Sequence, residues 1–497
     1  MKFLVIDCGT SGCRAAVISH KGKLLSQSKV PITVQRPAHG LAELDTNHLW
    51  SKVSAVIKKE TQKHSPSSLC CMGVSTMLGW VFLNAKYQPL MPAIVYMDNR
   101  AKNEVKQLLK LISPEEVFAR TGHRPSPLLL APQLTWLAKY NRPLFLKIHK
   151  TIGLKDELVR RLTGAVQTDF AHLDYSMLYN VREAKLDHDL LDLLNIDSSI
   201  LPTPRSPFSV AGYIHDSVAT ELNLPKGLPV ITGSSDGTTA IYGGGGLDRK
   251  IAVLVSGSTD VLMSYSKVYP VDPNCVLTIN TGAYPGTFTV GGPLGFSGAT
   301  LRYLSQIFRK DAKKLQRLVA SLDLNAPILL FLPGLGGERA PFWMEHVTGG
   351  LLGLTLEHHP EHIYRAAMEG CALRLKKILM IMEQVGIRPR VLNVVGGGAK
   401  SDVWNQIRAN VTGLEVRKLN VTEATSIGTA MFCYQALAKE GSLEEISLAW
   451  IKIKGRYRPE KKKVAYYGEM MSLFEQYLQR CAPLFESVER LRGQSPT

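Results

Sequence analysis

The sequence feature that most limits the fold is a strand-turn-strand pattern that occurs once in each half of the 497-residue chain. In both copies an apolar strand enters a short turn rich in Gly, Ser and Thr, and a second apolar strand follows directly. The strands lie at residues 3–6 and 15–18 around the turn 8–12, and at 251–255 and 261–265 around the turn 256–260. A third strand from Leu24 onward extends the first copy into a β-meander. The repetition predicts a duplicated domain.

The length also predicts two domains, because a single hydrophobic core stops growing at roughly 250 to 300 residues. Between the two copies, helical and strand patterns alternate at residues 46–60, 101–111, 154–162 and 228–232, which is typical of α/β layers. We place the boundary in the four glycines at 243–246, so that the domains span 1–246 and 247–497. These glycines predict an interdomain hinge or, alternatively, the tight packing of a helix end. A last helix is predicted at 469–492.

Composition excludes several classes of protein. With 45% hydrophobic and 20% charged residues the chain can form large cores, and no apolar run reaches the roughly 18 residues that span a bilayer. The start does not resemble a signal peptide, and the eight cysteines form neither a disulfide framework nor a CxxC pair. We therefore expect a cytoplasmic protein with reduced thiols and no membrane partner.

The net charge of +17 raises the question of nucleic-acid binding. Lysines and arginines gather in helix-like stretches, such as 309–314 and 461–463, without interleaved aromatic residues or a nucleic-acid motif. Runs of this kind are usually solvated surface, so we expect no nucleic-acid partner. The excess of positive charge favours, at most, the attraction of an anionic nucleotide.

The first turn has the residue types that hold phosphates. Its glycines let backbone N–H groups approach an anion, and Thr10 and Ser11 add hydroxyl donors. Asp7, at the end of the strand, is suited to hold Mg²⁺ through water, and Arg14 is suited to neutralise transferred charge. An ordinary hairpin turn is the alternative, since the same residues dominate turns.

The second turn, with Ser258 and Thr259, has the same character and also follows an apolar strand. Two such turns that hold one phosphate chain from two domains are the arrangement of the actin-like ATPases. The alternative nucleotide site, a P-loop, requires the pattern GxxxxGK[ST], which is absent from the sequence. The paired turns therefore predict ATP and Mg²⁺ as ligands.

A candidate catalytic base, Asp236, lies in a Gly/Ser/Thr segment at 232–239, after a strand around Val230 and before a helix start. This position exposes a carboxylate at a sheet edge. In phosphoryl transfer the base orients the acceptor hydroxyl and takes its proton late, which an aspartate can do. The alternative role is a helix N-cap, which Asp also favours.

These segments resemble the FGGY carbohydrate kinases, the family of glycerol, xylulose and gluconate kinases, over nearly the whole chain. The resemblance is carried by Gly349-Gly350-Leu351-Leu352-Gly353-Leu354 followed by residues 362–369, and by the segments 333–341, 396–404 and 423–430. It implies two duplicated α/β domains of the actin-like, ribonuclease-H-like type with a catalytic cleft between them. ATP is then expected mainly on the C-terminal side and the sugar mainly on the N-terminal side.

The resemblance also implies roles for individual residues. Asp236 is then the catalytic base, and Asp7 helps to bind the metal. The expected ATP contacts are Thr10, Ser11, Arg14, Ser258, Thr259, Gly298, Gly397, Gly398 and Asp402. The alternative for the glycines is helix and strand punctuation. The run 358–362, which holds three histidines, is interpreted as a helix start rather than a metal site, because no further ligands are evident.

The sugar side departs from the family pattern. The expected substrate contacts are Met77, Leu78, Asp98, Arg100, Asp236 and Gly237. Tyr96 replaces the tryptophan of the family's WxDxR segment, and a surface ion pair is the alternative for Asp98 and Arg100. The stretch 73–80 is apolar where xylulose kinases carry a polar segment, and Gln133 stands where the family usually has lysine. We therefore expect D-xylulose not to be the best substrate.

Together these features predict an ATP-dependent, Mg²⁺-assisted kinase of a small sugar or polyol, similar to the pentulose kinases. A kinase of gluconate or another sugar acid is the alternative enzyme. A catalytically silent sugar or nucleotide sensor is disfavoured by the joint presence of Asp7, Thr10, Arg14 and Asp236, and an actin-like chaperone or filament is disfavoured by the FGGY segments. A homodimer is left open.

Overall fold

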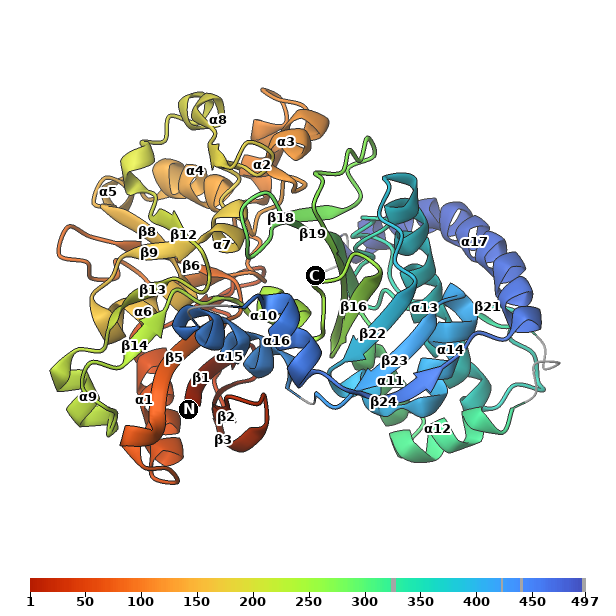
Figure 1. The fold of residues 1–497 in the computed structure, drawn as a ribbon. Coiled ribbons are helices and arrows are strands. Elements are labelled where there is room, and N and C mark those ends of the chain that lie inside the picture. Colours follow the sequence, from red (N-terminus) through yellow and green to blue (C-terminus); the bar gives the residue numbers. More distant parts are fainter. Residues whose placement is uncertain (323–327, 422, 439–440, 494–497) are drawn as a thin grey trace.

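A computed structural model describes residues 1–322, 328–421, 423–438 and 441–493, and it contains one large mixed sheet in each half of the molecule (Figure 1). The first sheet has the order β13-β14-β5-β1-β2-β3, with β15 paired to β5. Its strands are β1 (Lys2–Gly9), β2 (Gly12–Ser19), β3 (Leu24–Val30), β5 (Leu69–Thr76), β13 (Val210–Tyr213), β14 (Pro229–Ile231) and β15 (Ser234–Ser235).

The second sheet has the order β18-β19-β17-β16-β22-β23-β24. Its strands are β16 (Ile251–Ser256), β17 (Thr259–Ser266), β18 (Thr278–Thr281), β19 (Phe288–Phe296), β22 (Val391–Val395), β23 (Glu415–Leu419) and β24 (Ile453–Tyr457). A four-stranded sheet of β4 (Glu43–Leu44), β7 (Ala93–Val95), β6 (Gly79–Leu83) and β8 (Lys150–Gly153) lies in the first half, and three two-stranded sheets complete the described strands.

The two large sheets share one topology. In the first, β1, β2 and β3 form an antiparallel meander, and β5 and β14 continue parallel to β1. In the second, β16, β17 and β19 form the meander, and β22 and β23 continue parallel to β16. An antiparallel strand then ends each sheet on this side, β13 in the first and β24 in the second. This correspondence confirms the prediction of two duplicated α/β domains.

Helices cover the faces of both sheets. The long ones in the first half are α1 (Thr46–Thr61), α4 (Leu130–Tyr140), α6 (Leu154–Thr163) and α10 (Asp236–Gly243). Those in the second half are α11 (Gly298–Ile307), α12 (Ala312–Ala320), α13 (Pro360–Gln384), α14 (Asp402–Thr412), α15 (Ala424–Leu437), α16 (Leu443–Trp450) and α17 (Lys461–Gly493). Shorter helices are α2 (Lys102–Leu108), α3 (Pro114–Thr121), α5 (Arg142–Phe145), α7 (Phe170–Asp174), α8 (His188–Leu193) and α9 (Asp216–Leu222). In the described part of the chain no helix is long and apolar enough to span a bilayer.

Strand β1 is apolar from Phe3 to Ile6 because both of its faces are covered there. Leu4 and Ile6 belong to a core that also contains Leu49 of α1, whereas Phe3 and Val5 belong to a core that contains much of α15. Figure 1 shows α15 beside the strands of the first sheet, although α15 comes from the second half of the chain. The two halves are therefore joined by a shared hydrophobic core as well as by the chain itself.

The glycines at 243–246 lie at the end of α10 and are buried. A Cβ atom on Gly243 would collide with the carbonyl oxygen of Ala424, and a Cβ atom on Gly428 would collide with that of Thr239. Glycines thus let α10 and α15 cross at close range. The structure shows the tight helix packing that the sequence left open as the alternative to a hinge, while the boundary at residue 246 stays a prediction.

We expect Gly428→Ala to destabilise the protein by about 1 to 3 kcal/mol, because its methyl group must enter a space already filled by the α10 backbone. Gly468→Ala is the matched control, since Gly468 lies on the exposed face of α17 with open space around it. There, alanine should stabilise the helix by about 0.5 to 1 kcal/mol. Denaturant unfolding of both variants measures the difference, and equal stability of the two would contradict the close crossing.

Most predicted elements occur with shifted ends. The first turn is shorter than predicted, because β1 and β2 pair up to Gly9 and Gly12 and leave only Thr10 and Ser11 outside the ladder. Asp7 therefore lies inside a strand, opposite Arg14, rather than at its end. The helix predicted at 469–492 begins earlier, at Lys461.

Candidate active site

A cavity of about 520 Å³ lies between the two halves of the molecule. Segments from both sheets and their loops form its wall. The predicted residues that line it are Met77, Leu78, Asp236, Gly237, Ser258 and Thr259. Residues from the second predicted phosphate turn, the predicted base and the predicted sugar side thus share one space, whereas Asp7, Thr10, Ser11 and Arg14 of the first turn are not part of its wall.

Asp236 is the first residue of α10 and reaches the cavity. The N-cap of this helix is Ser235, whose hydroxyl accepts a hydrogen bond from Thr238 N, so the alternative N-cap role for Asp236 is wrong. Its Oδ1 accepts a hydrogen bond from Gly237 N at 2.7 Å. Burial, aided by the nearby charge of Asp7, raises the pKa of Asp236 to about 7. The carboxylate can therefore accept a proton near neutral pH.

Asp7 lies on β1, close enough to Asp236 for its charge to raise the pKa of that residue. Burial raises its pKa to about 6, and the positive charge of Arg14 opposes this rise. Arg14 forms ion pairs with Asp7 at 3.5 Å and with Glu423, which directly precedes α15. The sequence did not single out Glu423 as a site residue. Arg14 thus connects the first turn to the second half of the chain.

Both turns present hydroxyl groups near the cavity. Thr10 and Ser11 are exposed, and Thr10 Oγ1 lies 3.3 Å from the hydroxyl of Tyr96, which lines the cavity. Ser258 Oγ accepts a hydrogen bond from Arg302 Nη2 at 2.9 Å. The second turn is held from behind, because Ser256 Oγ accepts a hydrogen bond from Arg408 Nη2 at 2.6 Å. Asp260 Oδ1, on the other strand, accepts one from Ser297 Oγ at 2.6 Å.

The predicted glycines of the ATP side lie around the second turn. Gly298 begins α11, and a Cβ atom there would collide with the carbonyl oxygen of Gly257. Gly397 is exposed with open space around it, whereas Gly398 packs on Ser256. The position of Gly397 is open to a flat ligand, and the other two are required by packing.

Asp402 begins α14 and is directed toward β23 and β24. Its Oδ1 accepts a hydrogen bond from Tyr457 and forms an ion pair with Lys418 at 2.9 Å. The carboxylate is not part of the cavity wall. Its contact with ATP stays a prediction.

The sugar-side predictions separate into two groups. Met77 and Leu78 line the cavity from the loop between β5 and β6, and they make this part of the wall apolar. Asp98 and Arg100 instead form a buried ion pair at 2.8 Å, and Arg100 also pairs with Glu43 at 2.6 Å. Neither lines the cavity. The pair is buried rather than on the surface, and its contact with a substrate stays a prediction.

Several polar residues of the wall were not predicted, among them His123, Tyr175, Asn280 and Arg339. Asn280 lies on β18 between Ile279, whose N–H donates to the Gly122 carbonyl at 2.9 Å, and Thr281, whose hydroxyl donates to Asp174 at 2.9 Å. These contacts fasten β18 to the first half of the molecule. Arg339 lies in the segment 333–341, which resembles the FGGY family, but the sequence predicted no role for it.

Within the described part of the chain, two buried polar atoms of this wall, His123 Nε2 and Asn280 Oδ1, lack a hydrogen-bond partner of good geometry. Burial lowers the pKa of His123 to about 3, so the ring is neutral. Buried polar groups are rarely left unpaired in folded proteins, so a hydroxylated ligand is a suitable partner for both. Gln133 supports the loop beside them by donating hydrogen bonds to the carbonyl groups of Pro127 and Leu128.

Comparison with known proteins gives a consistent result. The model of the N-terminal domain of the FGGY family of carbohydrate kinases matches residues 2–243, and that of the C-terminal domain matches residues 252–437. The chain is 25% identical to a xylulose kinase of Escherichia coli K12 over 97% of this chain and 99% of that protein. It is 24% identical to a gluconokinase of Bacillus licheniformis, over 95% and 94% of the two chains.

The fold is also that of solved kinases. The crystal structure of a ligand-bound xylulose kinase from Lactobacillus acidophilus has a TM-score of 0.93 with 23% identity, and the match covers 98% of this chain and 99% of that one. Two family models that together span most of the sequence, and a cavity built by both domains, lead to one conclusion. The chain belongs to the FGGY family of carbohydrate kinases, which are phosphotransferases with an alcohol group as acceptor.

Proposed function

We propose that this carbohydrate kinase transfers the γ-phosphoryl group of MgATP to a hydroxyl of a small sugar or polyol, with Asp236 as the base. FGGY kinases use ATP, generally with Mg²⁺. The observation that carries the proposal is the position of Asp236. This carboxylate, with a pKa of about 7, faces a cavity whose wall also contains the second Gly/Ser/Thr turn.

The reaction needs little covalent assistance from the protein. The acceptor hydroxyl oxygen forms a bond to the γ-phosphorus while the bond from that phosphorus to the bridging oxygen of ADP breaks. Asp236 orients the hydroxyl and accepts its proton late, and a base with a pKa near the working pH is well matched to this task. Thr10 and Ser258 supply hydroxyl donors from the two turns, which keep the phosphate chain between the domains.

Asp7 is a suitable ligand for the Mg²⁺ ion that accompanies ATP. Mg²⁺ prefers oxygen ligands and is usually held by one or two carboxylates together with phosphate oxygens and water. The described residues contain no group of three or more His, Cys, Asp or Glu side chains that could hold a metal ion. The raised pKa of Asp7 reflects a carboxylate that a cation would stabilise.

A specific observation favours a sugar acid as the second candidate substrate. Arg339 lines the cavity, and no carboxylate of the described residues forms an ion pair with its guanidinium group, whereas the other arginine of the wall, Arg124, donates to the Cys275 carbonyl and stacks on Trp343. Burial lowers the pKa of Arg339 without making the group neutral. A carboxylate of the substrate is a suitable partner for this charge.

We expect ADP release to depend on a sugar or polyol and D-xylulose not to be the best acceptor, because the apolar contacts of Met77 and Leu78 cannot satisfy its hydroxyl groups. The measurement is kcat/KM for glycerol, erythritol, ketopentoses, ketohexoses and aldonates. If the value for D-xylulose exceeded all others by tenfold, about 1.4 kcal/mol, the pocket interpretation would be wrong. A preference for aldonates would favour the sugar-acid alternative, and no turnover with any acceptor would favour a silent sensor.

A further inference from the structure

We propose that a fully buried ionic network behind the cavity, formed by Lys155, Asp156 and Asp169, positions Asp236 through the hydroxyl of Ser234. This inference rests on the proposed role of Asp236 as the base. The network residues are positioning residues, because none of them lines the cavity. Their effect passes through the two residues, Ser234 and Ser235, that lead directly into the base.

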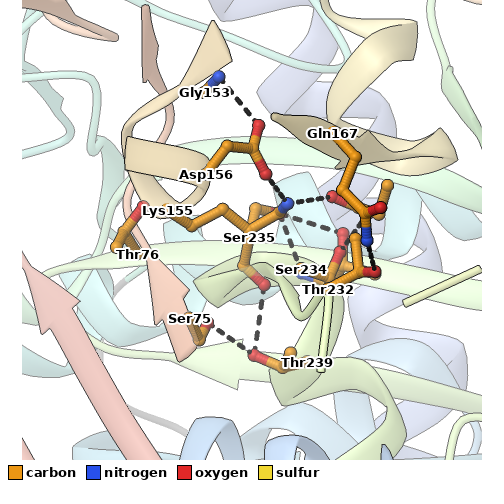
Figure 2. A network of polar contacts seen from close by, with 12 residues as sticks. Ser75, Thr76, Gly153, Lys155, Asp156, Gln167, Thr232, Ser234, Ser235 and Thr239 are labelled. Atoms are coloured by element: carbon orange, nitrogen blue, oxygen red, sulfur yellow. Dashed lines mark hydrogen bonds and ion pairs between the residues drawn. The ribbon is translucent and has the colours of Figure 1, made fainter. Parts of the chain in front are cut away.

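The network is built from short contacts (Figure 2). Lys155 Nζ forms ion pairs with Asp156 and, at 3.0 Å, with Asp169 Oδ1. Asp156 Oδ2 accepts a hydrogen bond from Gly153 N at 2.8 Å, and Asp169 Oδ2 accepts one from Ser234 Oγ at 2.6 Å. The exposed fractions are 0% for Lys155, Asp169 and Ser234 and 1% for Asp156. Bulk solvent therefore does not reach these side chains.

Stability is a poor explanation for this network. Removing three charged groups from water is costly, and apolar residues of similar volume often stabilise a core at least as well. What a charged network adds is direction, because each bond fixes an angle as well as a distance. An ionisable neighbour, His172, is buried with a lowered pKa and packs edge-on against Trp80, so it does not balance the charges. The network is therefore better explained by what it holds in place.

The part that it holds is short and weakly fixed by the sheet. Strand β15 consists of Ser234 and Ser235 alone, which pair with Ser75 and Thr76 at the end of β5. Below it, Thr239 Oγ1 donates to the Ser235 carbonyl at 3.1 Å and lies 3.1 Å from Ser75 Oγ (Figure 2). A strand of two residues has few ladder bonds of its own. The hydrogen bond from Ser234 Oγ to Asp169 Oδ2 adds a restraint on β15 beyond its pairing with β5.

Asp169 connects two walls of the cavity. It directly precedes α7 as its N-cap, and this helix ends at Asp174, next to Tyr175 of the cavity wall. One carboxylate therefore anchors both the segment that carries Asp236 and the helix that leads to Tyr175. Lys155, near the start of α6, fixes that carboxylate against the four-stranded sheet, since Gly153 of β8 is bonded to the same network. The base and the opposite wall thus share a common support.

The test removes one hydroxyl group and leaves the ion pairs intact. In Ser234→Ala we expect kcat to fall between about 10-fold and 100-fold, the loss that follows from a misplacement on the order of 1 Å, while KM for ATP stays within about twofold. Ser234→Thr restores the hydroxyl and should restore most of kcat. A loss confined to melting temperature, with kcat unchanged, would overturn the inference and leave the network a purely structural one.

Thr232→Val is the matched control. Thr232 is equally buried and lies in the same segment, but its hydroxyl bonds Gln167 at 2.8 Å and Ser209 at 3.2 Å and does not contact Asp169. We expect this variant to lose stability and to keep kcat within about twofold of the parent, because the contact to the base segment remains. A kcat loss equal to that of Ser234→Ala would mean that any lost buried hydroxyl has the same effect, and would also overturn the inference.

A readout without turnover separates this inference from the proposed function. Amide hydrogen exchange at residues 236–239 should become faster in Ser234→Ala and stay unchanged in Thr232→Val, because only the first variant frees the start of α10. Unchanged exchange in Ser234→Ala would overturn the positioning role. If exchange behaves as expected but the parent enzyme phosphorylates no sugar, the proposed function fails and the positioning of this segment stands.

Discussion

Asp236→Asn is expected to lower kcat for sugar phosphorylation by about 10²- to 10⁴-fold, the range for loss of a general base. The amide keeps the shape of the side chain but cannot accept the hydroxyl proton. Affinity for MgATP should change little, because the phosphate contacts are expected from Thr10 and Ser258 rather than from this residue. The measurement combines kcat, ATP affinity and melting temperature on one preparation.

Stability provides the control for this variant. Since Ser235 and not Asp236 caps α10, the substitution should not weaken the helix start. The folded protein holds the Asp236 proton more tightly than the unfolded chain, with a pKa of about 7 against 3.8. Stability of the parent therefore falls as pH rises through this window, because the carboxylate must become charged while buried. Asparagine carries no charge and does not have this penalty. The melting temperature of the variant, relative to that of the parent, should therefore increase as pH rises from about 4 to about 7.

Two outcomes would contradict this account. If turnover of Asp236→Asn stays within about threefold of the parent, far short of the loss for a missing base, Asp236 is not the base. If turnover falls together with melting temperature at every pH, the residue supports the fold and the kinetic loss is indirect. A variant that is inactive, binds ATP and is at least as stable as the parent is the expected result.

The duplicated fold could be predicted because its signal is local and repeated. Strand β1 is apolar at consecutive positions, as a strand buried on both faces must be, and its turn has small hydroxylic residues that recur after β16. The position of Asp236 could be predicted for the same reason, since a Gly/Ser/Thr run between a strand and a helix is a local pattern. The length of the first turn could not be predicted, because it depends on how far β1 and β2 pair.

The rest of the site depends on contacts between distant segments. His123, Tyr175, Asn280 and Arg339 come from four separate segments, and no sequence pattern joins them. They meet because β18 of the second sheet is fastened to Gly122 and Asp174 of the first half.

Two charged residues of the predicted sugar side show the same dependence on distant segments. Asp98 and Arg100 have the residue types of sugar ligands, but Glu43 and the Ala42 N–H, from another part of the chain, are bonded to them. A charged residue in a sequence does not reveal whether it faces a ligand or another side chain.

The double variant Thr10→Val with Ser258→Val tests the two phosphate turns together, and we expect it to weaken MgATP binding by about 10²- to 10⁴-fold. Hydrogen bonds to a charged group contribute about 1.5 to 3 kcal/mol each, and one is lost from each turn. The positions suit the test, because Thr10 is exposed at the tip of its hairpin and, of the described residues, Arg302 alone bonds Ser258 Oγ. Calorimetric titration, or the thermal stabilisation by MgATP, measures the loss.

The matched control exchanges the two side chains, as Thr10→Ser with Ser258→Thr. Both hydroxyls and the total number of methyl groups are retained, so ATP affinity should stay within about tenfold of the parent, or about 1.4 kcal/mol. If the valine variant binds MgATP as tightly as this control, the turns are ordinary hairpins and the nucleotide is held elsewhere. If affinity falls in both, the geometry of the turns rather than their hydroxyl groups governs binding. A loss confined to the valine variant would identify the hydroxyl groups of the two domains as the contacts that hold ATP across the cleft.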